Sequence, residues 1–584
     1  MILKKLLVYM KGFGRECVLG PLFKLLEASF ELIVPLIVAA IIDRGIPTLD
    51  RGYIVRMCLW LVVLGGVGLL SAVTAQYFAA RAAIGFSARL RHALMEHIGR
   101  LGYTELDRIG TSTLVTRMTS DVNQVQTGVN MTLRLLLRSP FVVFGAMVMA
   151  FTIDVRCALI FAAVIAVLCV IVFSIMLVTI PKYRAVQGQL DSVTAATREN
   201  LNGVRVLRAF CKEDTETEKF ARRNQLLTRM QLAVGRISAS MNPLTYVVIN
   251  AAVIALIHSG AVRVQLGSLT QGEVIALYNY MSQILVELVK LANTIVLLTK
   301  ALASGRRVAG VLEVECTMEF PDAAMPVPQI AQDEEVIGFS HVDLVYAGAG
   351  DKSLEDVTFS VKKGQTVGII GGTGSGKTSL VHLIPRFYDA TGGEVRIGGR
   401  DIKTYSKEQL CDIVGIVMQK AVLFQGTIRE NLLWGKRDAT EEELWNALTI
   451  AQAREIVEGK ADGLEEQIEQ GGRNLSGGQR QRLAIARTLV GQHPILVLDD
   501  SSSALDYATD AKLRMAIAGL DPKPTVLIVS QRAASILYAD LIIVMDDGRI
   551  VGQGTHEQLL QSCPVYREIY ASQFESDSAA KGGA

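Results

Sequence analysis

Three long stretches without a charged side chain constrain the fold of this chain more than any other feature. They cover residues 57–80, 157–181 and 237–262, and the third contains His258, which is neutral at pH 7. A bilayer core of roughly 30 Å needs about 20 helical residues to span it. Each stretch is long enough to cross a membrane as a helix, so we expect a membrane protein rather than an ordinary soluble enzyme.

Three further apolar stretches, 17–42, 135–153 and 273–301, carry a few charged residues in otherwise apolar sequence. Amphipathic helices on a surface are the alternative interpretation. Because charge in lipid is costly, we instead expect spans whose polar residues face the interior of a bundle or a watery cavity. The sequence therefore predicts six spans. The charged residues concerned are Lys24, Glu27, Glu31, Arg138, Glu287 and Lys290.

The composition indicates that these apolar stretches are accompanied by a large soluble part. Of the 584 residues, 50% are hydrophobic and 20% are charged, below the roughly 25% charged residues of soluble domains. These fractions exclude a disordered chain and argue against a protein that coats nucleic acid, whereas the formal net charge of +2 says nothing about partners. The eight cysteines include no CxxC pair, which excludes a zinc knuckle or a redox motif of that type.

Basic residues indicate the orientation of the spans. The links 81–132 and 182–236 are too long for turns, and both are rich in Lys and Arg, as is the N-terminus. The positive-inside rule places both termini and both long links in the cytoplasm of a cell whose inner (plasma) membrane holds the spans. Helical periodicity predicts that the spans continue into these links. We expect a short crossing helix near 110–121 and another near 199–213, both contacting the region 419–425.

A glycine-rich loop follows a short apolar strand at 365–370 and precedes an apolar helix from Ser379. It reads GGTGSGKT over 371–378, the strand–loop–helix context of a phosphate-binding loop. Glycines let successive N–H groups face phosphate oxygens, and the helix N-terminus favours negative charge. Lys377 is predicted to meet the β- and γ-phosphates of a nucleotide, and the Thr378 hydroxyl to bind Mg²⁺.

A second apolar strand at 494–500, PILVLDD, ends in two carboxylates. A buried strand that brings an aspartate to the edge of the phosphate loop is a usual way to hold Mg²⁺. Asp499 is predicted to take that role. The soluble region is therefore expected to be a nucleotide-binding α/β domain.

The stretch LSGGQRQR at 475–482 lies just before the aspartate-bearing strand and resembles the signature of ATP-binding-cassette (ABC) proteins. Tyr346 resembles the aromatic residue that stacks on adenine, and Gln419 the glutamine that links Mg²⁺ to the membrane domain. The loop 503–506, SALD, resembles the segment that crosses the dimer interface in that family. The resemblance covers nearly the whole chain.

The resemblance implies a half-transporter: a six-helix transmembrane bundle of the type I (type IV) ABC exporter fused to an α/β P-loop nucleotide-binding domain. Its expected cofactors are ATP and Mg²⁺, with Thr378, Gln419 and Asp499 at the metal. The nucleotide-binding residues that it implies are Tyr346, Gly371, Gly372, Thr373, Gly374, Ser375, Gly376, Lys377, Thr378, Ser379, Gln419, Leu475, Ser476, Gly477, Gly478, Gln479 and Asp506.

Four segments are predicted along the chain. Residues 1–315 form the transmembrane domain, 316–336 a linker with three prolines and many polar residues, 337–575 the nucleotide-binding domain, and 576–584 a disordered tail. The chain has one phosphate loop and one signature, and in this family the signature caps the nucleotide of the other subunit. One chain cannot complete a site, so a dimer with twelve spans is implied.

Two residues depart from the family pattern, both in the expected catalytic positions. Asp500 stands where the family usually has the glutamate that polarises the attacking water, and Gln531 where it usually has a histidine. Asp is one methylene shorter, which withdraws its carboxylate by about 1.5 Å, and a misplacement of about 1 Å can cost roughly 10²-fold in rate. Glutamine lacks the charge and proton chemistry of imidazole. Together with the intact signature, these departures resemble the degenerate-site subunit of a heterodimeric bacterial multidrug exporter.

The transported substrate is less constrained by the sequence. Export of amphipathic drugs, lipids or peptides is the main expectation. Three alternatives stay open. The chain could belong to an importer of exporter-like build for siderophore-type substrates, to a homodimeric exporter with slow hydrolysis, or to a regulator or channel that only binds ATP. Glu287 and Lys290 are three residues apart and share a helix face, so they could neutralise one another or contact substrate. No nucleic-acid partner is expected.

Overall fold

The computed structural model describes residues 6–321 and 334–581, and its contacts divide the chain into two compact units. The first unit contains residues up to 99 together with 111–314, and the second contains 100–110 together with 315–584. The division into a helical part and a mixed α/β part matches the predicted fold class. Residues 100–110 are an exception, because their contacts lie in the second unit rather than in the membrane domain expected over 1–315.

Six helical segments of the first unit are long and apolar enough to cross a membrane, counted over the described residues. All six predicted spans lie within them, including the three that carry charged residues. The segments are Gly14–Thr48, Arg51–Arg100, Thr111–Ile153, Val155–Asn202, Glu213–Gln265 and Gln271–Leu312.

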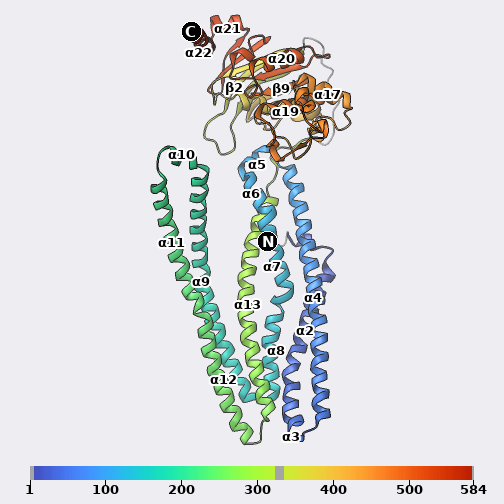
Figure 1. The fold of residues 1–584 in the computed structure, drawn as a ribbon, viewed down its shortest axis with the longest axis vertical. Coiled ribbons are helices and arrows are strands. Elements are labelled where there is room, and N and C mark those ends of the chain that lie inside the picture. The colour runs from blue at the N-terminus through green and yellow to red at the C-terminus, as the bar shows by residue number, and fades with distance from the viewer. Residues whose placement is uncertain (1–5, 322–333, 582–584) are drawn as a thin grey trace. The chain divides into compact units, whose positions relative to one another are not determined.

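Figure 1 shows these helices as the long coils coloured from blue to yellow-green. They are built from α2 (Gly14–Ala40), α3 (Ile46–Thr48), α4 (Arg51–Arg100), α6 (Thr111–Thr116), α7 (Val122–Met131), α8 (Arg138–Ile153), α9 (Val155–Asn202), α11 (Glu213–Ala239), α12 (Met241–Gln265) and α13 (Gln271–Leu312). Within the first and third segments, the helices are joined by short π-helical turns at Ile41–Gly45, Arg117–Asp121 and Thr132–Leu136.

Apolar side chains pack the inside of this unit and also cover much of its outside. One buried cluster joins α2, α8, α9, α12 and α13, with Phe161, Leu256 and Tyr280 fully buried. Leu59, Trp60 and Leu69 of α4 are by contrast more than half exposed. A helix satisfies its backbone hydrogen bonds internally, so an apolar outer surface is compatible with lipid as the surrounding solvent.

The short link before α13 joins the first and last spans closely. The Gly272 N–H donates to Asp43 Oδ1 at 2.7 Å, and the Thr270 hydroxyl donates to Asp43 Oδ2 at 2.6 Å. A Cβ on Gly272 would lie 2.4 Å from the Ala39 carbonyl oxygen, so only glycine permits this approach.

The long links are helical extensions of the spans, as the periodicity predicted. Helices α9 and α11 run side by side, and the short helix α10 (Val204–Ala209) connects them within the predicted crossing region 199–213 (Figure 1). The other crossing helix is α5 (Tyr103–Ile109), so its predicted position at 110–121 was wrong. Gly110, with φ of 79°, ends this helix rather than starting it.

Residues 111–121 instead begin the third spanning segment. Their hydroxyl side chains donate to carbonyls one turn earlier, Thr116 to Ser112 and Thr119 to Val115. Such bonds keep threonine and serine inside a helix, although these residue types often favour helix ends and turns.

The second unit is built on two sheets. The larger has the strand order β12 (Arg549–Gly554), β11 (Leu541–Asp546), β3 (Thr366–Gly371), β10 (Thr525–Val529), β9 (Ile495–Asp499) and β6 (Val414–Val417). Its five strands other than β12 pair in parallel, and every residue of β9 and β10 is buried, as continuous apolar runs predict. An antiparallel sheet has the order β2 (Leu354–Lys362), β1 (Glu335–Leu344), β4 (Gly392–Ile397) and β5 (Arg400–Asp401).

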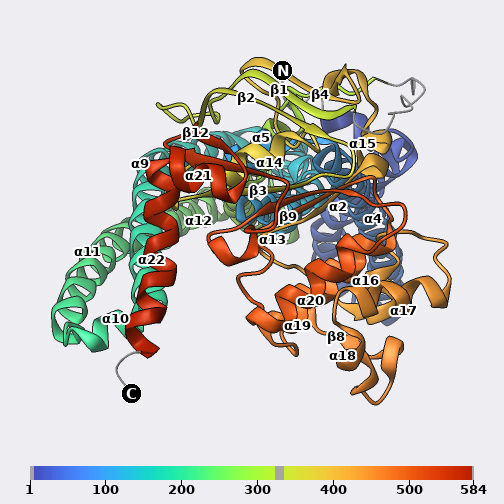
Figure 2. The same cartoon turned by 90° about the horizontal axis from the view of Figure 1, so that it is seen from above.

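The second unit also contains shorter helices, some of which pack on these sheets and others on one another. They are α14 (Lys377–Leu383), α15 (Lys407–Ile413), α16 (Ile428–Leu432), α17 (Glu441–Ile450), α18 (Arg454–Glu458), α19 (Gly477–Val490), α20 (Tyr507–Ala518), α21 (His556–Ser562) and α22 (Pro564–Lys581), and a small ribbon pairs β7 (Gly426–Thr427) with β8 (Gln467–Ile468). Figure 2 shows α16, α17 and α19 gathered together, in accord with their mutual contacts.

The structure bears on two of the predicted segments, the linker and the C-terminal tail. Most of the linker expected at 316–336 falls on residues 322–333, which lie outside the described residues. Helix α22 runs to Lys581, so the tail expected to be disordered from residue 576 is helical over 576–581. The tail contains Ala579, Ala580 and Lys581, which are good helix formers. Residues 582–584 lie outside the description, and the boundaries at 315 and 337 stay predictions.

Candidate nucleotide-binding site

The glycine-rich loop occupies the predicted position between β3 and α14. Gly374 and Gly376 have φ of 86° and 92°, in the left-handed region that side chains disfavour. A Cβ on Gly376 would lie 2.7 Å from the Ser353 carbonyl oxygen, whereas one on Gly372 or Gly374 would meet nothing within 4 Å. The loop therefore packs closely on one side and leaves space on the other, as a phosphate cradle requires.

Lys377 begins α14 and its side chain is buried. Its ammonium donates to the carbonyls of Gly371 at 2.9 Å and Gly372 at 2.5 Å, and to Ser375 Oγ at 3.2 Å. Burial lowers the pKa of Lys377, and the negative charges of Asp500 and Asp499 act in the opposite direction. The cation is thus held by weak neutral acceptors that phosphate oxygens can replace.

Asp499 lies at the end of β9 with only 1% of its surface exposed. Its Oδ1 accepts a hydrogen bond from the Thr378 hydroxyl at 3.1 Å, and its Oδ2 is buried without a hydrogen-bond partner. No group of three His, Cys, Asp or Glu side chains that could hold a metal occurs in the described ranges. Mg²⁺ commonly uses only one or two carboxylates together with substrate phosphates, so Asp499 and Thr378 fit this ion.

Asp500 and Gln419 meet beside this pair. Gln419 Nε2 donates to Asp500 Oδ2 at 3.3 Å. Asp500 has φ of 45°, which is unusual for a residue other than glycine, and burial raises the pKa of its carboxyl group. The hydrogen bond from Gln419 opposes that increase. This carboxylate therefore faces the phosphate loop in a partly buried, polar setting.

One cavity of about 500 Å³ brings most of these residues together. It lies at the carboxyl ends of β9 and β10, where parallel α/β sheets commonly bind ligands. Both residues that depart from the family pattern, Asp500 and Gln531, line it. Of the other predicted residues it contains Thr373, Gly374, Gly376, Lys377, Thr378, Ser379 and Gln419, and it adds Lys352, Ser353 and Asp547, which no sequence pattern had indicated.

Tyr346 lies next to the cavity rather than in its lining. Its hydroxyl donates to Ser379 Oγ at 3.0 Å, and its ring meets that of Tyr388 edge to face, with the ring centroids 5.0 Å apart. Burial raises the pKa of Tyr346. The contact with Ser379, in the first turn of α14, holds the aromatic ring at the mouth of the phosphate loop.

The signature lies at the N-terminus of α19. Ser476 caps this helix: its hydroxyl accepts from the Gln479 N–H at 3.2 Å, and Gln479 Oε1 accepts from the Ser476 N–H at 2.9 Å. Asp506 similarly caps α20 by accepting from the Thr509 N–H at 3.1 Å, and the side chain and backbone of Thr509 together lower the pKa of Asp506. Neither Asp506 nor any signature residue from Leu475 to Gln479 lines the cavity that contains Lys377.

The second unit also contains contacts that sequence reasoning missed. Helix α5 packs against the segment that follows α14: the rings of Tyr103 and Phe387 stack with centroids 4.6 Å apart, and the Tyr388 hydroxyl donates to Asp107 at 2.6 Å. These α5 contacts lie at 387–388, outside the expected region 419–425, and contact with that region stays a prediction.

His382 is a second residue that sequence reasoning overlooked. Its Nε2 lies 3.6 Å from Asp499 Oδ2, and both atoms are buried without a hydrogen-bond partner. The ring also meets Phe387 edge to face at 5.5 Å. His382 therefore connects the aspartate of β9 with the aromatic residues that contact α5.

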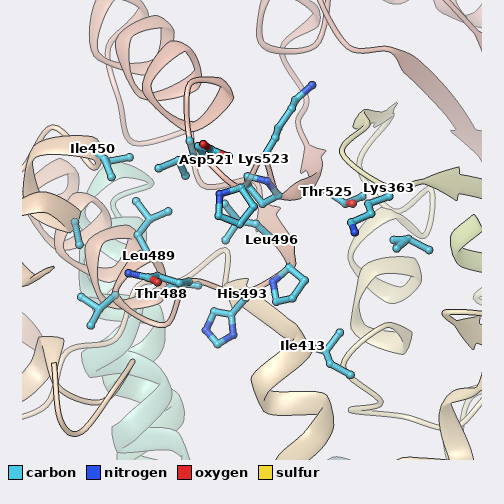
Figure 3. A pocket seen from close by; sticks show the side chains of 18 of the residues that line it. Lys363, Ile413, Ile450, Thr488, Leu489, His493, Leu496, Asp521, Lys523 and Thr525 are labelled. Carbon is cyan, nitrogen blue, oxygen red and sulfur yellow. The ribbon is translucent and has the colours of Figure 1, made fainter. Parts of the chain in front are cut away.

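A larger cavity of about 680 Å³ lies at the opposite edge of the same sheet. Figure 3 shows His493 and Leu496 near β9 and Thr525 at the start of β10, with Leu489 and Thr488 of α19 on the other side. This cavity contains none of the residues predicted to bind nucleotide or Mg²⁺. Size alone would therefore have misplaced the site, and we assign nucleotide binding to the smaller cavity on its chemistry.

Comparisons with known proteins agree with this geometry. Residues 17–288 match the family model described as the ABC transporter transmembrane region, and residues 354–503 match the model described as ABC transporter. The first match covers five spans and part of the sixth, and the second runs from β2 past Asp499 and Asp500.

Whole-length relatives have the same organisation. A Mycobacterium tuberculosis protein described as an uncharacterized ABC transporter ATP-binding protein is 37% identical over 588 residues, with 100% of each chain covered. An ATP-dependent lipid A-core flippase of Syntrophus aciditrophicus is 29% identical, covering 94% of this chain and 90% of its own. A solved structure of a bacterial Atm1-family ABC exporter with ATP bound is 21% identical and has a TM-score of 0.80, covering 96% of this chain and 99% of that one.

These matches extend from the first span to the nucleotide cavity and include the order of spans, phosphate loop and signature. The ATP-binding character of the second unit and the membrane location of the first are therefore shared with relatives along the whole chain. The chain belongs to the ABC transporter family, as a multi-pass membrane protein with a cytoplasmic nucleotide-binding domain.

Proposed function

We propose that this chain is one half of a heterodimeric, ATP-driven exporter and that its own phosphate loop forms a weakly hydrolytic site. Its signature would complete the competent site of a different partner chain. The exported compounds would be amphipathic. The observation that carries the proposal is that Asp500 and Gln531 line one cavity with Lys377.

Binding of ATP is assigned to side chains of this chain. Tyr346 would stack on the base, and Lys377 would exchange its carbonyl partners for phosphate oxygens. Thr378, Asp499 and Gln419 supply the oxygen atoms that suit Mg²⁺. When bound, Mg²⁺ would neutralise charge on the phosphates. Every group needed for binding is present, which supports retention of nucleotide by this chain.

Hydrolysis needs a base that reaches the attacking water. The Asp500 carboxylate already accepts a hydrogen bond from Gln419, and its side chain is one methylene shorter than glutamate. Gln531 can donate a hydrogen bond to a phosphate but cannot become a cation. We infer that the site retains nucleotide and turns it over slowly.

The signature supports the need for a second chain. Residues 475–479 form the capped N-terminus of α19, with Ser476 as the N-cap residue. They lie outside the cavity that contains Lys377. The backbone N–H groups at the start of α19 are a suitable anion site, which would face the γ-phosphate held by the other subunit. An intact signature beside an altered catalytic pair favours two unlike subunits over two identical ones.

The purified chain in proteoliposomes tests this assignment. We expect photo-crosslinking of labelled ATP to the chain, together with hydrolysis roughly 10²-fold below that of the Asp500→Glu/Gln531→His variant. The control is Asp438→Glu/Gln561→His, which makes the same two changes at exposed positions outside the cavity. If the unmodified chain alone hydrolyses ATP as fast as the restored variant, the heterodimer proposal is wrong and a homodimeric exporter is favoured.

Export itself needs a separate measurement. Inverted vesicles that contain the chain with its partner should accumulate a fluorescent amphiphile when ATP is supplied, and should not do so with a non-hydrolysable analogue. Accumulation in right-side-out vesicles with ATP trapped inside would instead indicate import.

A further inference from the structure

A row of four charged side chains crosses the helical unit between α2, α8 and α13. Arg138 Nη2 donates to Glu31 Oε2 at 2.6 Å, and Arg138 Nη1 donates to Glu287 Oε1 at 2.5 Å. Lys290 Nζ donates to the same Glu287 oxygen at 2.9 Å. We call these four residues the charge ladder, because negative and positive groups alternate along it.

The charge ladder lies at one depth in the apolar region. Glu31, Arg138 and Glu287 are each about 15 to 17 residues from the ends of their spans at Thr48, Ile153 and Gln271, which corresponds to about 22 to 26 Å at 1.5 Å per residue. This depth lies inside a bilayer core of roughly 30 Å. The ladder is therefore not a feature of the water-exposed loops.

Burial differs between the middle and the ends of the charge ladder. The side chains of Arg138 and Glu287 are 7% and 4% exposed, whereas those of Glu31 and Lys290 are 43% and 46% exposed. Charged groups at this depth cannot face acyl chains without large cost. The two exposed ends therefore face a polar space, such as a water-filled or ligand-filled cavity between spans.

Several polar atoms in and next to the charge ladder have no hydrogen-bond partner among the described residues. Within the described ranges, Glu31 Oε1 and two of the three donors of Lys290 have no partner. Arg138 Nε and Gln283 Oε1 are buried without a partner, and Gln283 is one helical turn from Glu287. Buried polar atoms normally have a partner, so these atoms point to a ligand or water at the ladder.

The charges balance. The ladder contains two cations and two carboxylates, and the neighbouring Lys24 and Glu27 form a further pair at 2.5 Å. A ligand with net charge would leave an uncompensated charge in a poorly solvated region, which is costly. A ligand with one positive and one negative group preserves the balance and can use both open ends.

We propose that the charge ladder binds the head group of a zwitterionic amphiphile, with the cationic group at Glu31 and the anionic group at Lys290. This assignment names the substrate class of the exporter and so rests on the proposed function. The buried Arg138–Glu287 pair, with the Ser139 hydroxyl donating to Glu287 Oε2 at 2.8 Å, holds the two ends in place.

Three amphiphiles with the same alkyl chain separate the possibilities: an alkylphosphocholine, an alkyltrimethylammonium and an alkyl sulfate. Binding to the full-length chain in maltoside micelles, which carry no charged head group, is measured by equilibrium dialysis below the micellar concentration of each probe. We expect the zwitterion to bind roughly tenfold more tightly than either ion, because it makes one more contact between opposite charges, and such an attraction at a partly exposed site contributes about that factor. Equal binding of all three would overturn the proposal.

Changing one end at a time gives a sharper test. Glu31→Gln leaves the ladder with one excess positive charge and should move the preference to the alkyl sulfate. Lys290→Gln leaves one excess negative charge and should move it to the alkyltrimethylammonium. The double variant Glu31→Gln/Lys290→Gln retains the buried pair, so it should fold and lose all head-group preference.

The matched controls are Glu216→Gln and Lys219→Gln, which make the same charge changes in an exposed pair on α11. Both should retain the preference of the unmodified chain. If either single ladder variant keeps the preference for the zwitterion, or a control shifts it, the proposal is wrong.

ATP-dependent movement of fluorescent forms of the three probes is measured separately. Movement without head-group selection would overturn the ladder assignment and leave the exporter standing. Selective binding without ATP-dependent movement would overturn the exporter and leave the binding site standing.

Discussion

Lys377 in the nucleotide cavity and Arg138 in the helical unit are both buried cations, but their partners differ. Lys377 is held by carbonyl and hydroxyl oxygens, and the described residues place no carboxylate within ion-pair distance of it. Arg138 contacts the carboxylates of both Glu31 and Glu287. The first arrangement keeps a cation available for an anionic ligand, whereas the second neutralises the cation within the protein.

Removal of Arg138 should produce the largest loss of stability. Arg138→Met removes the more buried of the two cations that contact Glu287, and breaking a buried pair costs roughly 3–5 kcal/mol. The unfolding midpoint in maltoside micelles measures this effect. In Arg138→Met/Glu287→Gln the loss should be smaller than the sum of the two single losses, because the residues are in contact. Additive losses would contradict the coupling.

Removal of Lys377 should instead change ligand binding. Lys377→Met should weaken ATP binding roughly 10- to 100-fold, the value of a hydrogen bond to a charged group. Its unfolding midpoint should stay near that of the unmodified chain, because only neutral acceptors lose a partner. Lys512→Met, on the exposed face of α20, is the matched control in a nucleotide titration. If Lys377→Met lowered the unfolding midpoint as much as Arg138→Met does, the two buried cations would not differ in their contribution to stability.

A smaller effect is expected where α5 meets the nucleotide domain. Tyr388→Phe removes the hydrogen bond to Asp107 while leaving the ring contacts, at a cost of about 1 kcal/mol. Amide hydrogen exchange in residues 103–109 should become roughly fivefold faster, since local opening follows local stability. Tyr405→Phe loses a bond to the Ile397 carbonyl away from α5 and should leave that exchange unchanged. Equal effects of the two variants would show that the Asp107 bond does not hold α5.

The smallest effect is expected for an exposed ion pair. Glu216 and Lys219 form a pair at 2.5 Å on α11, and exposed pairs contribute about 0.2–1 kcal/mol. Lys219→Gln should therefore shift the unfolding midpoint far less than Arg138→Met. A comparable shift would mean that burial does not distinguish the charge ladder from surface pairs.

Local sequence patterns predicted where much of the nucleotide site lies in the fold. The strand, loop and helix around Lys377 are contiguous, so the arrangement of Gly374, Gly376 and Thr378 follows from neighbouring residues. Asp499 was expected at the same edge because the carboxyl ends of parallel strands meet there. The roles of these residues in ATP binding stay predictions, as do the slow hydrolysis at Asp500 and the unlike partner.

Other features depended on contacts between distant residues. Glu287 and Lys290 were expected to share a helix face, with mutual pairing and substrate contact both left open, and they pair. Arg138 lies 149 positions from Glu287, and no pattern indicated the contact between them. The crossing helix was misplaced because hydroxyl-rich residues after Gly110 form bonds inside a helix. His382 and Tyr388 were overlooked because an isolated histidine or tyrosine carries no spacing signal.

The sequence by itself determined the six spans, the two strands that precede the phosphate loop and end at Asp499, and the phosphate loop itself, because each depends on periodicity or on residues adjacent in the chain. Only the tertiary structure decided which spans share the charge ladder, which cavity contains Asp500 and Gln531, and which residues contact α5. Those features depend on helices and strands packing across long separations, where the free energy of a charge is set by its surroundings rather than by its neighbours in sequence.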